Sequence, residues 1–592
     1  MIQNNYFTDN EDLQFHFDLL AEKKEIIDEY EHGFADAAKY KETGDEKLAY
    51  APSTHEEALD YYRTILENVG DLSGNQFSQA ARELDEIGLK YKDGKVEFPK
   101  LMVENYNKFT EAGLLPYALK RENNGLGLPV SIITILVEVL ARADIGFGMT
   151  FGVNNLSEVI EKYGSEEQKA KWLPKMASGE YTGAMALSEP NFGSDLSSVM
   201  TKAVKQDDGT YRLTGTKRYI THGCGMAEAP SAILTLARTG SPESGARGLS
   251  FFIVDSKDIE VIGIEHKLGL KCSPTCEIAY ENSPAELIGE EGRGLTKFAM
   301  GMMNGARLGV GNLSVGNATA AYYEAVKYAE EREQFGKKIK DIPAVKKILD
   351  KMEREVAAMR CLNMEAAYSI DMYHWRSEHL LESGKSEREV RKDAHVQFWD
   401  RIATLFTPLC KYYSSEVANQ LAYDCIQIHG GAGFTEDYDA ARIYRDSRIL
   451  SIYEGTTQLQ MLAAIGGVTA GMSATGYLRK YLEELTAQFE VSEDSQKLRE
   501  IFEKAIDTYK SIEKSEDKSL VAFEMVDLAT RYINGLLLEH TASRLEGEKK
   551  AKRLQLCEEY NIDSLGIAAS HVNRLERTAA KSGSEKLELV AG

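Results

Sequence analysis

The chain has 592 residues, of which 43% are hydrophobic and 28% are charged, and its formal net charge at pH 7 is −23. This length is enough for several domains and for a large core that needs neither disulfides nor metal ions for stability. A surface this acidic repels phosphate backbones, so nucleic acid is not an expected partner, although a few placed arginines and backbone N–H groups can still hold a phosphate-bearing ligand.

The cysteines and the N-terminal segment indicate the compartment. The seven cysteines are odd in number and scattered, so we expect free thiols rather than disulfides or a zinc site. Residues 1–14 lack the basic start and apolar run of a signal peptide. The most apolar stretch, residues 129–140, contains polar side chains and is too short to span a bilayer. We therefore predict a soluble cytoplasmic protein with no metal and no membrane insertion.

Residues 1–180 are predicted to be mostly helical. After a glycine-rich loop at 125–129, residues 133–140 repeat apolar side chains at the spacing of a helix that faces a core. Ser165 and Gln168 have the residue types and the spacing of a capping box, which marks the start of a further helix.

The pattern changes between residues 181 and 290. Short β-type runs occur at 211–215, 232–236 and 251–254, and each is bounded by glycine, proline or serine. Because single strands need partners to be stable, these runs together predict an all-β domain between two helical parts.

Helical patterns return after residue 290. Residues 322–329 form one apolar stripe, and residues 417–425 form another that runs into a Gly430–Gly431 stop. This order of helical and β regions predicts an α+β protein with segregated layers. The predicted domains are an N-terminal helical extension at 1–80, a helical domain at 81–180, a middle β domain at 181–290, a helical-bundle domain at 291–470 and a C-terminal helical extension at 471–592.

Two segments of the β region carry residues suited to a planar ring or a phosphate. In residues 186–195, proline and glycine turns place the hydroxyls of Ser188 and Ser194 beside backbone N–H groups. Further along, Tyr219 and Thr221 would point to the same face of a strand, where they could stack on a flavin and hydrogen-bond to it. Taken singly, an ordinary turn or strand end is the more common explanation of either segment.

Three later segments offer further ligand contacts. Arg332 ends an amphipathic helix, and its planar guanidinium suits pyrophosphate oxygens, although a charged helix end before a glycine is common. Three glycines within 430–433 let the backbone approach a ligand, and we interpret His429 beside them as structural. Glu454 precedes Gly455 at a break in regular structure, from which its carboxylate could project into a cavity; a helix cap is the alternative.

Together these segments resemble the acyl-CoA dehydrogenase family. The resemblance runs from about residue 100 to 470 and implies an N-terminal helical domain, a middle β-barrel-like domain and a C-terminal four-helix bundle, to which this chain adds an extra C-terminal helical domain. The added residues before 80, near 372–395 and after 470 make the chain similar to the long bacterial branch, which includes methylthiopropanoyl-CoA and broad-range acyl-CoA dehydrogenases. The matching words are Glu189-Pro190 with Gly193-Ser194-Asp195, Arg332 with Phe335-Gly336, Gly430-Gly431 and Tyr453-Glu454-Gly455-Thr456.

The resemblance also implies the residues of the active site. Glu454 is the base, because the other position at which relatives carry the catalytic glutamate, directly before Arg307, is Ala306 in this chain. Arg307, Ser194 and Tyr453 contact the acyl-CoA substrate. The residues implied to bind FAD are Leu187, Ser188, Ser194, Tyr219, Thr221, Arg332, Gln334, Phe335, Gln427, Gly430, Gly431, Thr456 and Gln458.

The implied reaction is the FAD-dependent α,β-dehydrogenation of an acyl-CoA thioester to the trans-2-enoyl-CoA, as in the β-oxidation of fatty acids, with electrons passed to an electron-transfer flavoprotein. An acyl-CoA oxidase reoxidised by O2 is the alternative. A flavin-containing nucleic-acid binder of the same family is disfavoured by the acidic chain. Because the C-terminal extension would cover the surface at which compact relatives pair their dimers, we expect a homodimer.

Overall fold

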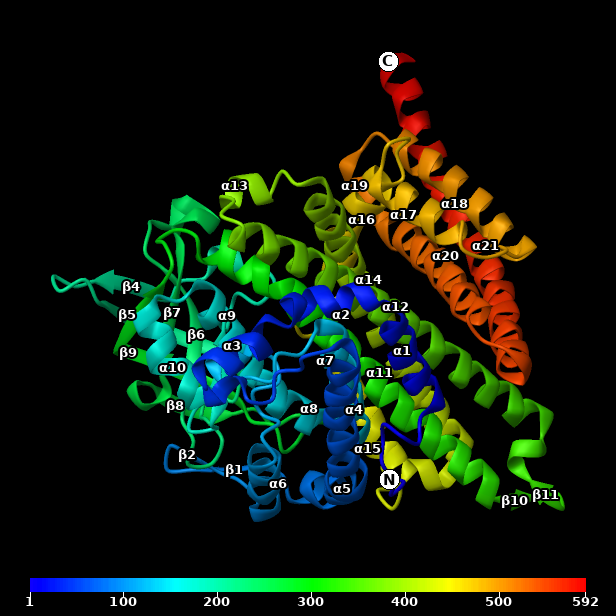
Figure 1. Cartoon of the computed structure of the whole chain (residues 1–592). Coiled ribbons are helices and arrows are strands. Elements are labelled where there is room, and N and C mark those ends of the chain that lie inside the picture. The colour runs from blue at the N-terminus through cyan, green and yellow to red at the C-terminus, as the bar shows by residue number, and fades with distance from the viewer. Residues whose placement is uncertain (592) are drawn as a thin grey trace. The chain divides into compact units, whose positions relative to one another are not determined.

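The computed structural model describes residues 1–591 (Figure 1). The chain folds into two compact units. Unit 1 comprises Met1–Gly309 and Thr435–Ile449, and unit 2 comprises Val310–Phe434 and Leu450–Gly592. The chain therefore crosses between the units more than once, and neither unit is a single continuous segment.

The first 180 residues of unit 1 are helical, as predicted. The capping box of α10 is present, because the Gln168 N–H donates to Ser165 Oγ and the Ser165 N–H donates to Gln168 Oε1. A short hairpin, β1 (Lys90–Lys92) with β2 (Lys95–Glu97), was not predicted, although the Asp93-Gly94 pair between its strands, with φ +51° and +78°, is a typical two-residue hairpin turn. The helices are α1 (Glu11–Glu22), α2 (Lys24–Tyr30), α3 (Ala35–Thr43), α4 (His55–Leu72), α5 (Ser78–Ile87), α6 (Lys100–Glu111), α7 (Val130–Ala143), α8 (Ile145–Gly152), α9 (Ser157–Tyr163) and α10 (Glu166–Ala177).

Helix α7 lies at the centre of this helical region. It begins directly after Pro129, and every side chain from Thr134 to Ala143 is buried. Ile133, which the apolar spacing directs toward a core, is only half-buried. The helix is covered on nearly all sides rather than along one stripe, which is the usual environment of a helix that is apolar all round.

The β domain of unit 1 is a closed ring of strands, which confirms the β-barrel-like prediction. The strand order is β3-β6-β4-β5-β9-β7, and β7 pairs again with β6, while β8 adds to β9. Strand β6 is buried on both faces: Ile233 packs in one apolar cluster with Phe252 and Ile278, and Leu234 packs in a second cluster with Trp172 of α10. The strands are β3 (Thr182–Ala186), β4 (Lys202–Lys205), β5 (Tyr211–Thr221), β6 (Ser231–Arg238), β7 (Leu249–Asp255), β8 (Glu260–Ile264) and β9 (Thr275–Ile288).

Unit 2 contains the predicted helical bundle. Helix α11 starts in unit 1 and continues into unit 2, where Asn363 of α12 donates to Asn312 of α11 at 3.0 Å. Helix α14 ends where predicted, because Gly430 takes φ +60° directly after His429. The elements are α11 (Met300–Glu331), β10 (Glu333–Gln334), β11 (Lys337–Lys338), α12 (Pro343–Glu382), α13 (Glu387–Val390), α14 (Ala394–His429) and α16 (Thr457–Gly471), while α15 (Asp439–Ser447) belongs to unit 1.

The C-terminal extension of unit 2 is helical, as predicted. Its long helices α20 and α21 pack against each other, and α20 also packs on α12 and α16 of the bundle (Figure 1). Charged side chains take part in this attachment, since Arg354 of α12 donates to Asp563 of α21 at 2.6 Å. The helices are α17 (Tyr477–Thr486), α18 (Glu493–Ser511), α19 (Ser515–Leu520), α20 (Ala522–Ser543) and α21 (Gly547–Ala591).

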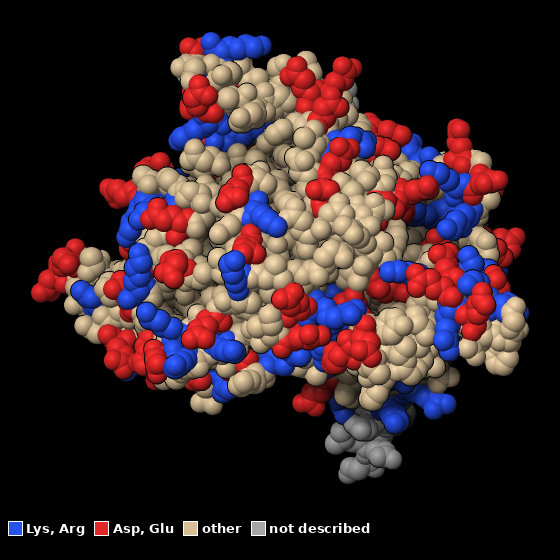
Figure 2. All heavy atoms as spheres, turned by 90° about the horizontal axis from the view of Figure 1, so that it is seen from below, with Lys and Arg blue, Asp and Glu red and all other residues tan. Residues whose placement is uncertain are grey.

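Two further observations concern the apolar character of the helices and the charge on the surface. Across residues 1–591, no helix combines the length and the apolar character needed to cross a bilayer. On the face shown in Figure 2, acidic and basic side chains are interspersed, so this face has no single area of one sign.

Candidate active site

The loop after β3 is the first element of the site in unit 1. Leu187 is buried, Ser188 is half-buried and Ser194 is exposed. The carbonyl oxygen of Ser188 accepts a hydrogen bond from the Arg218 N–H at 3.0 Å. The start of the loop therefore lies beside the end of β5, so the structure brings the two predicted flavin-binding segments of the β domain together.

Glu189 and Lys217 form a buried ion pair within this loop. Lys217 Nζ donates to Glu189 Oε1 at 3.0 Å and to the Leu187 carbonyl oxygen at 2.8 Å. The backbone N–H groups of Met200 and Thr201 donate to the same carboxylate at 2.7 and 2.9 Å. The Glu189 carboxylate therefore joins the two ends of the loop to each other and to strand β5.

Burial and pairing shift the pKa values of both partners. Burial acts to raise the pKa of Glu189, but the Lys217 charge and the backbone donors leave that pKa below its ordinary value. Burial lowers the pKa of Lys217 to about 8, against the opposing effect of Glu189. The sequence carries a signal for this pair, because Lys217 continues the inward positions of β5 that Tyr211 and Leu213 occupy, and an inward lysine needs a counter-charge.

Strand β5 is irregular where it reaches the residues predicted to face a flavin. Its pairing with β9 shifts register between Lys217 and Ile220, and Tyr219 has φ +66°. The Tyr219 ring is 58% exposed, with the Arg218 guanidinium 5.1 Å from its centroid, and Thr221 is half-buried. Regular alternation along β5 is therefore wrong at this point, and a bulge presents the Tyr219 ring at the surface.

His222 follows this strand end and is completely buried, although no role was predicted for it. Its Nδ1–H donates to the Gly225 carbonyl oxygen at 3.1 Å, and its Nε2 lies 3.0 Å from Thr150 Oγ1. Burial lowers the pKa of His222 to about 4, so the ring is neutral at neutral pH. Both ring nitrogens are thus engaged in fixing the turn that follows Thr221.

Arg307 lies on the part of α11 that belongs to unit 1. Its side chain is buried, and its Nη1 donates to Asn304 Oδ1 at 3.2 Å. The preceding residue, Ala306, has no group that accepts a proton. This position on α11 therefore supplies no base.

Glu454 of unit 2 lies outside regular structure. Glu454 has φ +54° and Gly455 has φ +89°, both in the left-handed region. Gln460, from the first turn of α16, donates its Nε2 to the carbonyl oxygens of both residues, at 3.1 and 2.9 Å. A Cβ at position 455 would lie 2.7 Å from that nitrogen, and side chains rarely adopt φ +89°, so the turn favours glycine. The Glu454 side chain is half-buried on this fixed turn.

The neighbours of Glu454 point to a ligand. The buried hydroxyl of Tyr453 has no hydrogen-bond partner among the described residues, and burial, followed by the charge of Glu454, raises its pKa. A buried polar atom without a protein partner costs free energy unless a ligand satisfies it. Thr456 precedes α16 without capping it through its side chain, and Gln458 is exposed, so both are accessible for a similar role.

The remaining predicted cofactor residues of unit 2 lie at two neighbouring helix ends. Tyr328 of α11 stacks on His429 of α14 with ring centroids 4.3 Å apart. Beyond this stack, Phe335 turns the β10–β11 hairpin with φ +52° and is 92% exposed. A Cβ built on Gly430 or Gly431 would meet nothing within 4 Å. The predicted cofactor residues at these ends are all exposed, namely Arg332, Gln334, Phe335, Gln427, Gly430 and Gly431.

Comparison with known protein families identifies the class. The chain matches the N-terminal domain of acyl-CoA dehydrogenases at residues 63–180, the middle domain at 184–283 and the C-terminal domain at 292–378 and 390–467. These matches cover more than half of the chain, which therefore belongs to the acyl-CoA dehydrogenase family. The break after residue 378 falls in the region where the sequence indicates an insertion.

Individual relatives agree with this assignment. The 3-methylmercaptopropionyl-CoA dehydrogenase of Ruegeria pomeroyi is 34% identical over 430 residues, which are 69% of this chain and 70% of the relative. The solved butyryl-CoA dehydrogenase of Megasphaera elsdenii is 29% identical, with a TM-score of 0.58 over 69% of this chain and 98% of its own. A solved acyl-CoA dehydrogenase of Bacillus anthracis, complexed with FAD, shares the fold with a TM-score of 0.74 over 88% of this chain and 91% of its own, at 24% identity. The chain is thus an oxidoreductase of the acyl-CoA dehydrogenase class, and its cofactor is FAD.

The residues present fit this cofactor. Unit 1 offers the exposed ring of Tyr219 and the hydroxyls of Ser188 and Thr221 on two segments that the hydrogen bond from Arg218 N–H to the Ser188 carbonyl joins, which suits a planar flavin. Unit 2 offers an exposed guanidinium at Arg332 and open backbone at Gly430, which suit a pyrophosphate. Of the predicted site residues, Leu187, Ser188, Ser194, Tyr219, Thr221 and Arg307 belong to unit 1, and Arg332, Gln334, Phe335, Gln427, Gly430, Gly431, Tyr453, Glu454, Thr456 and Gln458 belong to unit 2.

Proposed function

We propose that this protein converts an acyl-CoA thioester to its trans-2-enoyl-CoA, with Glu454 as the base that removes the α-proton. The observation that carries the proposal is the turn at Glu454 and Gly455, where two left-handed residues held by Gln460 present a half-buried carboxylate. Backbone strain of this kind persists where function requires the conformation. Ala306 at the other position for a base supports the same assignment.

The chemistry gives each group a separate task. An α-hydrogen beside a thioester is only weakly acidic, so the Glu454 carboxylate takes it as a proton while the β-hydrogen leaves as a hydride. FAD supplies the two-electron acceptor for that hydride. We assign the backbone N–H of Glu454 to the thioester carbonyl oxygen, where negative charge develops as the proton leaves. An apolar acyl chain beside the carboxylate excludes water from it and makes it a stronger base.

The remaining predicted residues bind and orient. We assign Arg307, Ser194 and Tyr453 to the acyl-CoA; the buried charge of Arg307 and the unpartnered hydroxyl of Tyr453 support this. The flavin ring is assigned to Tyr219 and Thr221, with the loop at Leu187, Ser188 and Ser194. The pyrophosphate and adenine side is assigned to Arg332, Gln334, Phe335, Gln427, Gly430 and Gly431, and Thr456 and Gln458 also contact FAD.

The electron acceptor is proposed to be an electron-transfer flavoprotein. An acyl-CoA oxidase, in which O2 takes the electrons, is the alternative, and the two reactions share every step on the substrate. The test is to mix the purified protein, under anaerobic conditions, with a panel of acyl-CoAs. The panel includes 3-methylmercaptopropionyl-CoA, because the relative from Ruegeria pomeroyi is named for that compound. Bleaching of the flavin absorbance supports dehydrogenation and ranks the substrates; rapid return of colour in air, with H2O2, identifies the oxidase.

Replacement of the base is the direct test. In Glu454→Gln the side chain keeps its size but accepts no proton, so we expect turnover to fall by at least ~10²–10⁴-fold, while FAD content and acyl-CoA binding stay as in the parent enzyme. Glu490→Gln, at an exposed glutamate, is the matched control and should leave turnover unchanged. Turnover of Glu454→Gln close to that of the parent would refute the base assignment.

We further propose that the protein is a homodimer and works in the cytoplasm. The exposed aromatic rings of Phe335 and Phe434, which are 92% and 88% exposed in unit 2, support an interface between subunits at the proposed pyrophosphate side. A solution mass of two chains by light scattering supports the dimer, and a mass of four chains contradicts it. The net charge of −23 gives no support to a nucleic-acid-binding role, which a gel shift at low salt checks.

A further inference from the structure

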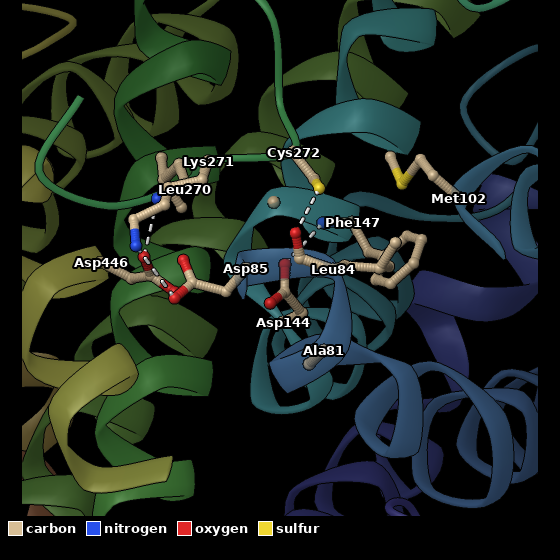
Figure 3. Close-up of a pocket in the computed structure, with 11 residues that line it drawn as sticks. Ala81, Leu84, Asp85, Met102, Asp144, Phe147, Leu270, Lys271, Cys272 and Asp446 are labelled. Carbon is tan, nitrogen blue, oxygen red and sulfur yellow. Dashed lines mark hydrogen bonds and ion pairs between the residues drawn. The ribbon is translucent and has the colours of Figure 1, made fainter. Parts of the chain in front are cut away.

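Unit 1 contains a cluster of charged side chains that none of the assigned roles uses, and Figure 3 shows four of them, Asp85, Asp144, Lys271 and Asp446. It forms where α15 meets α5, the start of α8 and the connection between β8 and β9. We call it the α15 charge cluster. Its members are Asp85, Asp144, Lys271, Arg442, Arg445 and Asp446.

Asp446 is the centre of this cluster and is 2% exposed. Its Oδ1 accepts a hydrogen bond from the backbone N–H of Leu270 at 2.7 Å, and its Oδ2 lies 3.5 Å from Arg442 Nη1. A Cβ at Gly269 would collide with the same carboxylate. Asp446 therefore binds α15 closely to the β8–β9 connection.

The carboxylates of the cluster differ in how many cationic partners each of them has. Asp85 pairs with both Arg445 and Lys271, at 3.2 and 3.4 Å. Asp144, Asp439 and Asp446 instead share one guanidinium, since Arg442 Nη1 also donates to Asp144 Oδ2 at 2.7 Å and Arg442 Nε donates to Asp439 Oδ1 at 3.4 Å. Buried carboxylates at one cation repel each other, so one of them favours the protonated form.

The pKa values agree with this description. Burial raises the pKa of Asp446 to about 7, against the attraction of Arg442 and with further help from the negative charge of Asp144. Burial likewise raises the pKa of Asp144. The other charged groups that act on Asp446 are Asp85 on α5 and Lys267 on the β8–β9 connection, while Arg445 and Lys271 pair with Asp85.

The cluster is too small to be a binding site for a substrate. The cavity that Asp85, Asp144, Lys271, Cys272 and Asp446 line has a volume of about 20 Å³, which is room for about one water molecule. Nor does any group of histidine, cysteine or carboxylate side chains among the described residues form a metal site. The cluster must therefore act through the segments that it holds.

Those segments lead to both halves of the proposed reaction. Along the chain, Glu454 follows Asp446 by only eight residues, through the short turn Arg448–Ser451. On the other side, Leu270 belongs to the connection that leads to Thr275, whose hydroxyl accepts a hydrogen bond from Lys267 at 2.9 Å and which pairs with Thr221 of β5.

We propose that Asp446 is a positioning residue for the dehydrogenation: by binding the Leu270 N–H and Arg442 together, it fixes both the end of α15, after which the chain continues to the base, and the connection that backs the flavin-facing strand end. The proposal rests on the proposed function, because it assumes that Glu454 is the base. A loss of position of about 1 Å at a reacting group costs on the order of 10²-fold in rate, so the effect is measurable in turnover.

Two variants and one control test the proposal in the holoenzyme. Asp446→Ala removes the hydrogen bond and the charge, and we expect it to lower kcat by on the order of 10²-fold with little change in the KM for acyl-CoA or in FAD content. Asp446→Asn keeps an acceptor for Leu270 and resembles the protonated acid, so kcat should return to within about threefold of the parent at neutral pH. Asp437→Asn, at an exposed residue just before α15, should change nothing.

Hydrogen exchange gives a readout that does not depend on activity. In Asp446→Ala, the backbone amides of residues 268–275 and 448–456 should exchange faster than in the parent and in Asp437→Asn. Faster exchange with unchanged kcat, or unchanged exchange and kcat in both Asp446 variants, overturns the positioning role. If Asp446→Ala does not fold, Gly269→Ala decides, because its Cβ would push the Asp446 carboxylate and the Arg445 backbone away from the connection; a fall in kcat at unchanged KM supports the proposal, and a kcat equal to that of the parent contradicts it. Full activity in Glu454→Gln would instead reject the proposed function, whatever the Asp446 variants show.

Discussion

The loops of the β domain that are predicted to face the flavin and the C-terminal helices α17–α21 both bury a carboxylate, yet they differ in what that carboxylate holds. Glu189 in the β domain binds Lys217 and the backbone N–H groups of a loop. Asp527 of α20 binds only side chains, from Tyr412 of α14, Arg531 of α20 and His571 of α21. The first fixes a loop that carries predicted ligand contacts, and the second fixes helices to one another.

This difference shows what a shifted pKa reports. The pKa values of Glu189 and Asp527 are both lowered, that of Asp527 to about 2, because paired cations and donors outweigh the effect of burial. Neither carboxylate is proposed to react. The proposed base, Glu454, is instead half-buried on a left-handed turn. In this protein a buried carboxylate with several close partners has a structural role. Whether that role supports the active site depends on the segments to which its partners belong.

The largest expected effect is at the ion pair of the β domain. Lys217→Met leaves the Glu189 carboxylate buried without its counter-charge, so we expect the free energy of unfolding to fall by about 3–5 kcal/mol and FAD content to fall with it. Adding Glu189→Gln to Lys217→Met should restore part of both, because no unpaired charge is then buried. Urea unfolding and the ratio of flavin to protein absorbance measure the two quantities. If the free energy of unfolding of Lys217→Met alone lies within about 1 kcal/mol of that of the parent, the ion pair does not stabilise the β domain in the way described.

The second largest effect is expected at low pH, where the β domain should lose stability before the C-terminal helices do. The pKa of His222 is lowered from 6.5 to about 4, so its contribution to stability is full above pH 6.5 and is lost as the pH falls through 4. The size of this shift corresponds to roughly 3 kcal/mol. The pKa of Asp527 is about 2, so its contribution to the stability of the C-terminal helices persists to lower pH. Thermal unfolding between pH 7 and 4, followed by flavin fluorescence, should show the β domain failing first, and His222→Gln should weaken this pH dependence. An unchanged dependence in His222→Gln contradicts the assignment.

The smallest effect is expected in the C-terminal helices. Asp527→Asn weakens charge-assisted hydrogen bonds to Arg531 and His571, so we expect a loss of about 2 kcal/mol in the free energy of unfolding. Because none of its partners carries a proposed ligand contact, FAD content and kcat should equal those of the parent. Denaturant unfolding and steady-state kinetics on one preparation measure both. A loss of FAD or of turnover in the folded variant would show that the two regions do not differ in the way described.

Much of the fold could be predicted from the sequence, because local patterns specify it. The capping box at Ser165, the strand at 232–236 and the helix stop at Gly430 are each encoded by residues close together in the chain, and each is present. The bulge at Tyr219 could not be predicted, since an alternating pattern does not show a register shift. The five family-like segments predicted the class correctly, while the roles of the individual site residues stay predictions.

The buried ion pairs that support the candidate site were harder to predict than the exposed residues of the site. Lys217 and Glu189 stand 28 residues apart, and only the inward position of Lys217 on β5 hints at a partner. The α15 charge cluster gives only one local signal, the i,i+4 pair of Arg442 and Asp446, because its other pairs are distant in sequence: Arg442 and Asp144 are separated by 298 residues and Arg445 and Asp85 by 360. Pairings of this kind follow from the tertiary fold, which one sequence does not specify by periodicity alone.

The discontinuity of unit 1 has a consequence for how the protein is made. A ribosome adds about 5–20 residues per second, so Arg445 emerges roughly 20–70 seconds after Asp85, its partner in the finished fold. During that interval the nascent chain contains Asp85 and Asp144 without the arginines that neutralise them. Unit 1 therefore cannot complete its fold until α15 has been synthesised, after residues 310–434 of unit 2 have already left the ribosome. The segment that carries the proposed base is added to the chain directly after α15, the last part of unit 1 to be synthesised.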